Sequence, residues 1–168
     1  MKTNNYVNPW IYKGRPYDPS EEELKEWVGF CYRLTELETG KMYVGKKFFW
    51  KPKTLPVTKT RKRRVKTKVL SDWKDYYGSS EEVKLLVEEG TEFKREILHL
   101  ARTKGECTYY EAKEQFAQDV LLRDEYYNQF IGCKIHAKHV SKMKEDYNDE
   151  TISVSGVPYK VKKKDLNL

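Results

Sequence analysis

The sequence has little of what stabilises secreted or membrane proteins. Its three cysteines are widely spaced and contain no CxxC pair, which argues against both a disulfide framework and a zinc knuckle. No apolar run approaches the roughly 20 residues that span a bilayer, and the N-terminus lacks the apolar core of a signal peptide. The chain also shows no repeat at solenoid periods. These absences predict a cytoplasmic protein with no membrane partner.

What the chain has in excess is positive charge. Its 33 Lys and Arg residues outnumber 26 Asp and Glu residues, giving a net charge of +7 and a pI of about 9.1. Such an excess favours an anionic partner, most commonly nucleic acid, because dense phosphates attract clustered Lys and Arg. A mean hydropathy of −0.89 is low, but 14% aromatic residues argue against wholesale disorder.

Two β-rich runs separated by a turn predict an antiparallel hairpin. They span residues 28–35 and 42–49, and Gly40 suits the positive φ of the turn between them. Residues 92–101 alternate in polarity, which predicts a third strand. The residues expected on one face of that strand are Phe93, Arg95, Ile97 and His99. The expected sheet is small, three-stranded and antiparallel.

Helices are expected before and after the third strand. Ser79 or Ser80 caps the first of them. The longest helix is expected over residues 109–124, because Thr108 and Glu111 form a capping-box pattern at its start. Its apolar stripe would consist of Phe116, Ala117, Val120 and Leu121. With these flanking helices, the sheet makes an α+β fold.

Composition divides the chain into three parts. Residues 1–27 are predicted to form an N-terminal arm with a short helix, and residues 141–168 a charged tail containing a short hairpin. The domain between them, residues 28–140, contains a basic insertion at 51–70. Two prolines and dense charge predict that this insertion is an exposed loop.

The basic insertion has three interpretations: a solvated loop, a nuclear-localisation-like patch, or an arm that contacts DNA. The flanking aromatic residues Trp50 and Trp73 favour the last. Contacts of this kind give affinity and register without reading sequence. The candidate DNA-binding residues are Lys59, Arg61, Lys62, Arg63, Arg64, Lys66 and Lys68.

Two tyrosines in the predicted hairpin point to a known family. Phe30-Cys31-Tyr32 lies on the first strand and Tyr43-Val44-Gly45 on the second, with the tyrosines 11 positions apart. Tyrosines placed in this way usually just pack across strands. With the basic segment, the third strand and a helix bearing glutamates following in order, however, the chain resembles the GIY-YIG endonucleases. The motifs KMYVGKKFFW, SDWKDYYGSS and YYEAKEQF resemble phage-encoded, Seg-like members, which are described as homing-endonuclease-like.

The resemblance implies hydrolysis of phosphodiester bonds in double-stranded DNA with one divalent ion, Mg²⁺ or Mn²⁺, held by a single glutamate. One carboxylate can suffice because Mg²⁺ retains most of its waters. Glu111 fits the YYE pattern of the phage members, but on an ideal helix it lies in line with Gln115 and Gln118 and would face solvent. Glu114, one turn further on, would face the sheet. Both stay candidates, with a slight preference for Glu114.

The resemblance also implies roles for the two tyrosines and an asparagine. Tyr32 would act as general base or position the attacking water, and Tyr43 would bond the same water or the phosphate. A tyrosine has a pKa near 10, so Tyr32 could act as a base only in a cationic setting, which Lys46, Lys47 and the metal would supply. Asn128 would position the metal site or simply form the turn after the helix.

One expected residue is missing. The family has a phosphate-binding arginine on the helix after the second tyrosine motif, but no arginine lies within ten residues of Tyr43 on its C-terminal side. Lys46 or Lys47 would replace it, or an arginine of residues 61–64 would fold back, although lysine lacks the bidentate fork. This departure leaves two other hypotheses open: a catalytically weak nucleic-acid-binding protein, and a basic structural or assembly protein.

Overall fold

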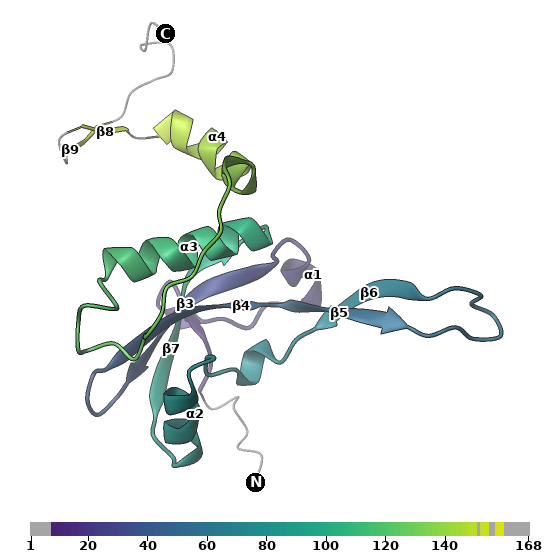
Figure 1. The fold of residues 1–168 in the computed structure, drawn as a ribbon, viewed down its shortest axis with the longest axis horizontal. Helices are drawn as coiled ribbons and strands as arrows, with labels where there is room; N and C mark the ends of the chain where they lie inside the picture. Colours follow the sequence, from purple (N-terminus) through teal and green to yellow (C-terminus); the bar gives the residue numbers. More distant parts are fainter. Residues whose placement is uncertain (1–7, 151, 155–156, 160–168) are drawn as a thin grey trace, which may run out of the picture. The chain divides into compact units, whose positions relative to one another are not determined.

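The computed structural model describes residues 8–150, 152–154 and 157–159, and the chain divides into two compact units, Met1–Lys134 and Ile135–Leu168. The first unit contains a five-stranded sheet in the order β2-β1-β7-β3-β4 (Figure 1). All neighbouring strands are antiparallel except β1 and β7, which are parallel. The α+β class is confirmed, but the expected count of three strands is wrong.

The two additional strands come from the N-terminal arm. β1 (Ile11–Tyr12) and β2 (Arg15–Pro16) form a tight hairpin. The two residues between them both have positive φ, 50° at Lys13 and 78° at Gly14, which is the geometry of a two-residue hairpin turn. Lysine seldom adopts this conformation, so the sequence gives only a weak signal for the turn.

The three predicted strands are present. β3 (Gly29–Glu36) lies at the centre, between β4 (Met42–Phe48) and β7 (Phe93–Ala101). The turn between β3 and β4 contains Gly40 at a φ of 75°, as predicted. Register places Tyr32 of β3 directly opposite Gly45 of β4.

A β-bulge in β7 changes which side chains face which way. Tyr32 pairs with Ile97, yet the preceding residue, Cys31, pairs with His99, so Leu98 is the extra residue. His99 therefore lies on the opposite face from Ile97 and contacts α3 (Lys104–Ala117). The prediction that His99 shares a face with Phe93, Arg95 and Ile97 is wrong, because strict alternation assumes an uninterrupted ladder.

Helix α3 begins earlier than predicted. Thr103, not Thr108, is its N-cap, and the Thr103 hydroxyl accepts a hydrogen bond from the Glu106 amide at 3.0 Å. The helix ends at Ala117, so residues beyond it leave the helical register. Of the expected apolar stripe, Val120 is buried as predicted, but Ala117 is exposed and Phe116 and Leu121 are 63% and 49% exposed.

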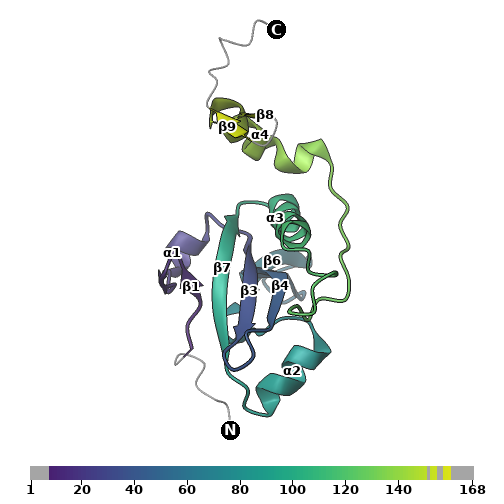
Figure 2. The ribbon, with the colours of Figure 1, turned by 90° about the vertical axis from the view of Figure 1, so that its left-hand side faces the viewer.

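Helices on the other face of the sheet cover the larger core. α1 (Glu21–Leu24), the 3₁₀ turn η2 (Trp73–Asp75) and α2 (Glu81–Glu88) contribute Leu24, Trp73 and Val83 to this core, whereas α3 packs on the opposite face, next to β3 and β4 (Figure 2). Of the two candidate caps of α2, Ser80 is the N-cap, and its hydroxyl accepts a hydrogen bond from Val83. The core residues include Trp10, Leu24, Phe30, Tyr32, Leu34, Trp73 and Val83.

The basic insertion is a β-ribbon, not a loop. β5 (Trp50–Leu55) and β6 (Val65–Leu70) pair along their full lengths and project away from the sheet (Figure 1). Alternating Val and Thr in β6 favour a strand despite the lysines between them. Prolines are tolerated because a two-stranded ribbon has only edge strands. The predicted exposure is confirmed.

The second unit contains the 3₁₀ turn η3 (Ala137–Val140), α4 (Ser141–Glu150) and a hairpin of β8 (Ile152–Val154) and β9 (Val157–Tyr159). The hairpin was expected from the sequence. In the described part of the chain, no helix combines the length and apolar character needed to cross a bilayer.

Candidate active site

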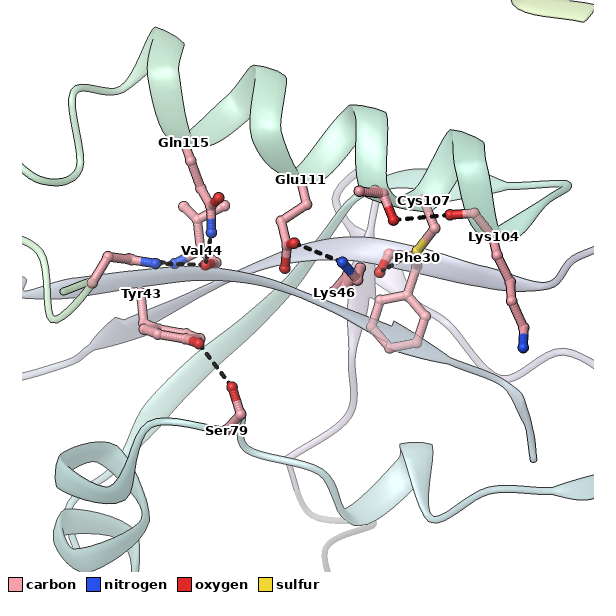
Figure 3. Close-up of polar contacts among 11 residues, drawn as sticks. Phe30, Tyr43, Val44, Lys46, Ser79, Lys104, Cys107, Glu111 and Gln115 are labelled. Atoms are coloured by element: carbon pink, nitrogen blue, oxygen red, sulfur yellow. Dashed lines mark hydrogen bonds and ion pairs between the residues drawn. The ribbon is translucent and has the colours of Figure 1, made fainter. Parts of the chain in front are cut away.

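The candidate site lies on both faces of the edge strand β4. Tyr43 and Lys47 project to the face covered by α2, which we call the tyrosine face. Val44 and Lys46 project to the face covered by α3, which we call the helix face, where Lys46 meets Glu111 (Figure 3). Because side chains alternate along a strand, neighbouring residues of β4 thus lie on opposite faces of the sheet at its edge.

Tyr32 is fully buried on the tyrosine face, with 0% of its surface exposed. A Cβ on Gly45 would lie 2.5 Å from the Tyr32 hydroxyl, and a Cβ on Gly78 would lie 3.2 Å from it. Gly78 also has a φ of 92°, which disfavours other residues. The two glycines therefore make room for the phenol, which explains the glycine that follows Tyr43-Val44.

Contacts through Tyr76 and Ser79 connect the two tyrosines. The Tyr32 ring packs against that of Tyr76, with ring centres 6.0 Å apart, and Ser79 is close enough to Tyr76 to act against the rise in its pKa that burial causes. The Ser79 hydroxyl lies 3.0 Å from that of Tyr43 (Figure 3). Neither Tyr76 nor Ser79 was selected from the sequence as a site residue, although both belong to the quoted motif SDWKDYYGSS.

Burial makes the tyrosines weak acids. It raises the pKa of Tyr32 well above the usual phenol value, and the neighbouring Tyr76 and Tyr43 raise it further. Burial also raises the pKa of Tyr43, against a lowering effect of the Ser79 hydrogen bond. Both phenols are therefore neutral at neutral pH.

The cationic setting expected for Tyr32 depends on Lys46, Lys47 and the metal. Lys47 forms an ion pair with Asp72 at 2.6 Å and lies 3.9 Å from the ring centre of Tyr76. The hydrogen bond from Lys47 lowers the pKa of Asp72. Lys46 lies on the helix face. Neither lysine is among the groups that shift the pKa of Tyr32, and the role expected of the lysines together with the metal stays a prediction.

Glu111 faces the sheet, contrary to the prediction. Its carboxylate lies 3.0 Å from the Lys46 ammonium, and its side chain is only 15% exposed (Figure 3). Glu111 is also close enough to Tyr32 and Tyr43 for its charge to raise the pKa of each. Gln115, taken as a solvent-facing neighbour, is instead buried and donates a hydrogen bond to the Val44 carbonyl at 3.0 Å.

Glu114 has different partners. It lies 2.7 Å from His99 of β7 and accepts a hydrogen bond from Gln118 at 2.6 Å. Burial acts to raise the pKa of Glu114, but these two hydrogen bonds outweigh it and the net pKa is lowered. His99 in turn stacks on Tyr110 with ring centres 4.4 Å apart. Glu114 thus belongs to a network between α3 and β7.

Asn128 holds the edge strand in place. Its side-chain oxygen accepts a hydrogen bond from the Val44 amide at 3.0 Å, and its side-chain nitrogen donates one to the Val44 carbonyl at 2.8 Å. Just before it, the Tyr127 amide donates to the carbonyl of Met42 at 2.7 Å. Asn128 is buried and therefore fixes the backbone next to Tyr43.

In the part of the chain that the structure describes, no arginine lies on the first α-helix after the second tyrosine motif. The ribbon follows β4, and the first α-helix after the ribbon is α2, whose only basic residue is Lys84. The positive charge of Lys84 acts to lower the pKa of Tyr43, so this lysine lies on the tyrosine face. Arg61 hydrogen-bonds to the Pro56 carbonyl within the loop that closes the ribbon, so it does not fold back.

The side chains around β4 suit a metal ion such as Mg²⁺ that is held by one carboxylate better than a metal ion held by several protein ligands. Among the residues that the structure describes, no three His, Cys, Asp or Glu side chains gather in a way that could hold a metal ion. One partly buried carboxylate, Glu111, lies across the edge strand from the tyrosines and acts on them through its charge. Carboxylate oxygen is the ligand that Mg²⁺ and Mn²⁺ prefer, and Mg²⁺ completes its shell with water and substrate oxygens.

Comparison with known families identifies the domain. Residues 10–131 match the family model described as the GIY-YIG domain of putative endonuclease segE. The chain belongs to this family. The match spans more than two thirds of the chain, and membership marks its domain as that of an endonuclease. No curated protein and no solved structure matches the chain.

The limits of the match show which parts belong to the GIY-YIG domain. The match starts at Trp10, so it includes β1, β2 and α1, which the sequence motifs left outside. It ends at Ile131, three residues after Asn128. All of the side chains that surround β4 therefore lie within the domain.

Proposed function

We propose that the protein is a metal-dependent endonuclease that hydrolyses phosphodiester bonds of double-stranded DNA at the edge of β4. The observation that carries the proposal is the pairing of a carboxylate and a cation, Glu111 and Lys46, across the edge strand from Tyr43, near enough for the Glu111 charge to act on the tyrosine. Such a site combines hydrogen-bond donors, a positive charge and a ligand for a metal, which are the groups that stabilise a phosphoryl transition state.

In this proposal Glu111 holds Mg²⁺ or Mn²⁺. The bound ion would act as a Lewis acid on the phosphate and would make water a better nucleophile. The ion pair with Lys46 at 3.0 Å supports this choice over Glu114, because it directs the Glu111 carboxylate at the edge of β4, whereas Glu114 is bound to His99 and Gln118. Lys46 would then neutralise charge on the phosphate, with Lys84 as a further cation on the tyrosine face.

The two tyrosines have different roles in the proposal. Tyr43 is partly exposed, and its hydroxyl can bond the attacking water or a phosphate oxygen. Tyr32 is enclosed, so it acts as a positioning residue through Tyr76 and Ser79. Because both phenols are neutral, the proton of the attacking water passes to solvent or to a phosphate oxygen instead of to a preformed tyrosinate.

Plasmid nicking tests the proposal. The full chain is incubated with supercoiled DNA in Mg²⁺, in Mn²⁺ and in EDTA, and conversion to open-circular and linear forms is followed on gels. We expect cleavage in both metals and none in EDTA. DNA binding without cleavage in either metal would support a binding protein instead, and cleavage in EDTA would exclude the metal.

A further inference from the structure

The ribbon of β5 and β6 contains the entire positive excess of the protein. Residues 50–70 include nine of the 33 Lys and Arg residues and none of the 26 Asp and Glu residues. The rest of the chain therefore has 24 basic residues against 26 acidic ones. The net charge of +7 is a property of one structural element and not of the whole surface.

Among the described residues, these cations have no acidic partner at ion-pair distance, and the Arg61 guanidinium bonds only to the Pro56 carbonyl within the loop. Eight of the nine are exposed, and within the described part of the chain none of the nine forms an ion pair. Like charges packed on a ribbon repel one another, so the arrangement is unfavourable until an anion neutralises it. Lysine on edge strands also prevents aggregation. A few charges are enough for that purpose, so it does not account for all nine of these cations.

The ribbon presents charge on both of its faces. Register places Lys51 and Lys53 opposite Val69 and Thr67 on one face. Lys66 and Lys68, opposite Thr54 and Pro52, lie on the other face. Neither β5 nor β6 pairs with a further strand. Both faces are thus free to meet one partner at the same time.

The base of the ribbon is anchored, which fixes its direction relative to β4. Only Phe49, fully buried, separates β4 from β5. The Trp50 indole donates to the carbonyls of Leu24 and Trp27 at 3.2 and 3.1 Å. On the other strand, the Ser71 hydroxyl donates to the Phe48 carbonyl at 2.6 Å. The edge strand of the site therefore continues into the ribbon (Figure 1).

We propose that this ribbon enters the major groove of duplex DNA about one helical turn from the bond that is cleaved. The inference rests on the proposed nuclease function and identifies where the substrate lies. A major groove about 12 Å wide admits a two-stranded ribbon, whereas a minor groove about 6 Å wide does not. One row of lysines then faces base edges and the other row faces phosphates.

The distance follows from the strand rise. Lys53 lies ten positions after Tyr43, which corresponds to at most about 33 Å along an extended chain. One turn of B-DNA is about 34 Å. The contact between the ribbon and DNA would therefore extend the protein's footprint on one side of the cleaved bond. Contacts with base edges in the groove would also add a preference for certain bases there, beyond the backbone contacts expected from the sequence.

Binding in EDTA tests the ribbon separately from cleavage. The full chain is titrated onto a fluorescent duplex of about three turns at several salt concentrations. One variant combines Arg61→Gln, Arg63→Gln and Arg64→Gln, a second combines Lys66→Gln and Lys68→Gln, and a control combines Lys13→Gln and Arg15→Gln on β1 and β2. We expect at least about tenfold weaker binding for both ribbon variants and a salt slope lower by about 0.9 per lost phosphate contact, with the control unchanged.

Competition then distinguishes the groove from the phosphates alone. The major groove of A-form RNA is too narrow for the ribbon, so an RNA duplex of the same sequence should compete at least about tenfold less well than DNA. Equal competition by RNA would overturn the proposal. The proposal would also be overturned if the ribbon variants bound DNA as tightly as the wild type but aggregated on size exclusion. The charges would then serve only to keep the protein soluble. If DNA binds as expected but the protein does not nick plasmid in Mg²⁺, the proposed function fails and the ribbon stands.

Discussion

The two faces of β4 differ in how their polar groups are satisfied. On the tyrosine face, Tyr32, Tyr76, Ser79 and Tyr43 form a group of neutral hydroxyls. On the helix face, Glu111 and Lys46 form a partly buried ion pair. A neutral group orients protons and fixes geometry, whereas a charged pair creates a field that a metal or a phosphate can use.

This difference separates the groups that orient from the groups that carry charge. The edge strand brings them together because alternate residues of one strand face opposite sides. Asn128 and Gln115 then hold that strand by the Val44 carbonyl, at 2.8 and 3.0 Å. Substitutions on the helix face should therefore affect metal use most, and substitutions on the tyrosine face should affect geometry most.

Glu111→Gln should have the largest effect. The substitution keeps the size of the side chain and removes the proposed metal ligand, so the nicking rate in Mg²⁺ should fall by about 10³-fold, which corresponds to several kcal/mol. Glu114→Gln is the matched control, because it lies on the same helix and breaks only the contacts with His99 and Gln118. Equal losses in the two variants would contradict the assignment of the metal to Glu111.

Tyr43→Phe should rank second. It removes the partly exposed hydroxyl that is proposed to touch water or phosphate, so kcat should fall by about 10²-fold. The ring stays in place against Tyr32, with their centres 6.3 Å apart, so unfolding temperature should change little. Steady-state nicking and thermal melts check both statements. A KM effect at unchanged kcat would mean that the hydroxyl binds substrate without acting in the transition state.

Tyr32→Phe should have a smaller effect, about tenfold, because it removes one enclosed hydroxyl of the group that positions Tyr43. Burial raises the pKa of Tyr32, so the phenol stays protonated throughout the assay range and no rate increase follows from its ionisation. The pH–rate profile of the variant should therefore have the same shape as that of the wild type. A pH dependence that disappears with the hydroxyl would instead identify Tyr32 as the general base.

Much of the fold could be predicted from local sequence. β3, β4 and β7 follow from β-rich runs, and the turn at Gly40 follows from its need for positive φ. The ribbon could not be recognised, because its lysines obscured the β-branched alternation in β6. The bulge at Leu98 was equally invisible, since only pairing with β3 shows that one residue of β7 is extra.

The site was harder to predict than the fold. The tyrosines were found by their spacing, but choosing between the glutamates depended on where α3 begins. The polar neighbours Gln115 and Gln118 made the Glu111 face look exposed, whereas Gln115 is buried and bonds to the Val44 carbonyl. Thr103 in place of Thr108 as the cap also frees Glu111 from a capping role. Tyr76 and Ser79 come from a segment far from β4 in sequence, so only the folded core, built around Trp73 and Tyr32, shows that they meet the tyrosines.

Two adjacent serines give the smallest and most selective test. The Ser79 hydroxyl bonds to Tyr43, whereas Ser80 caps α2. Ser79→Ala should lower the nicking rate by about three- to fivefold, the equivalent of one exposed hydrogen bond of under about 1 kcal/mol, and should leave the unfolding temperature nearly unchanged. Ser80→Ala should do the reverse, because losing an N-cap costs about 1 kcal/mol of stability and touches none of the tyrosines. If both variants changed only stability, the group of hydroxyls would be part of the packing and the tyrosine face would not orient the reaction.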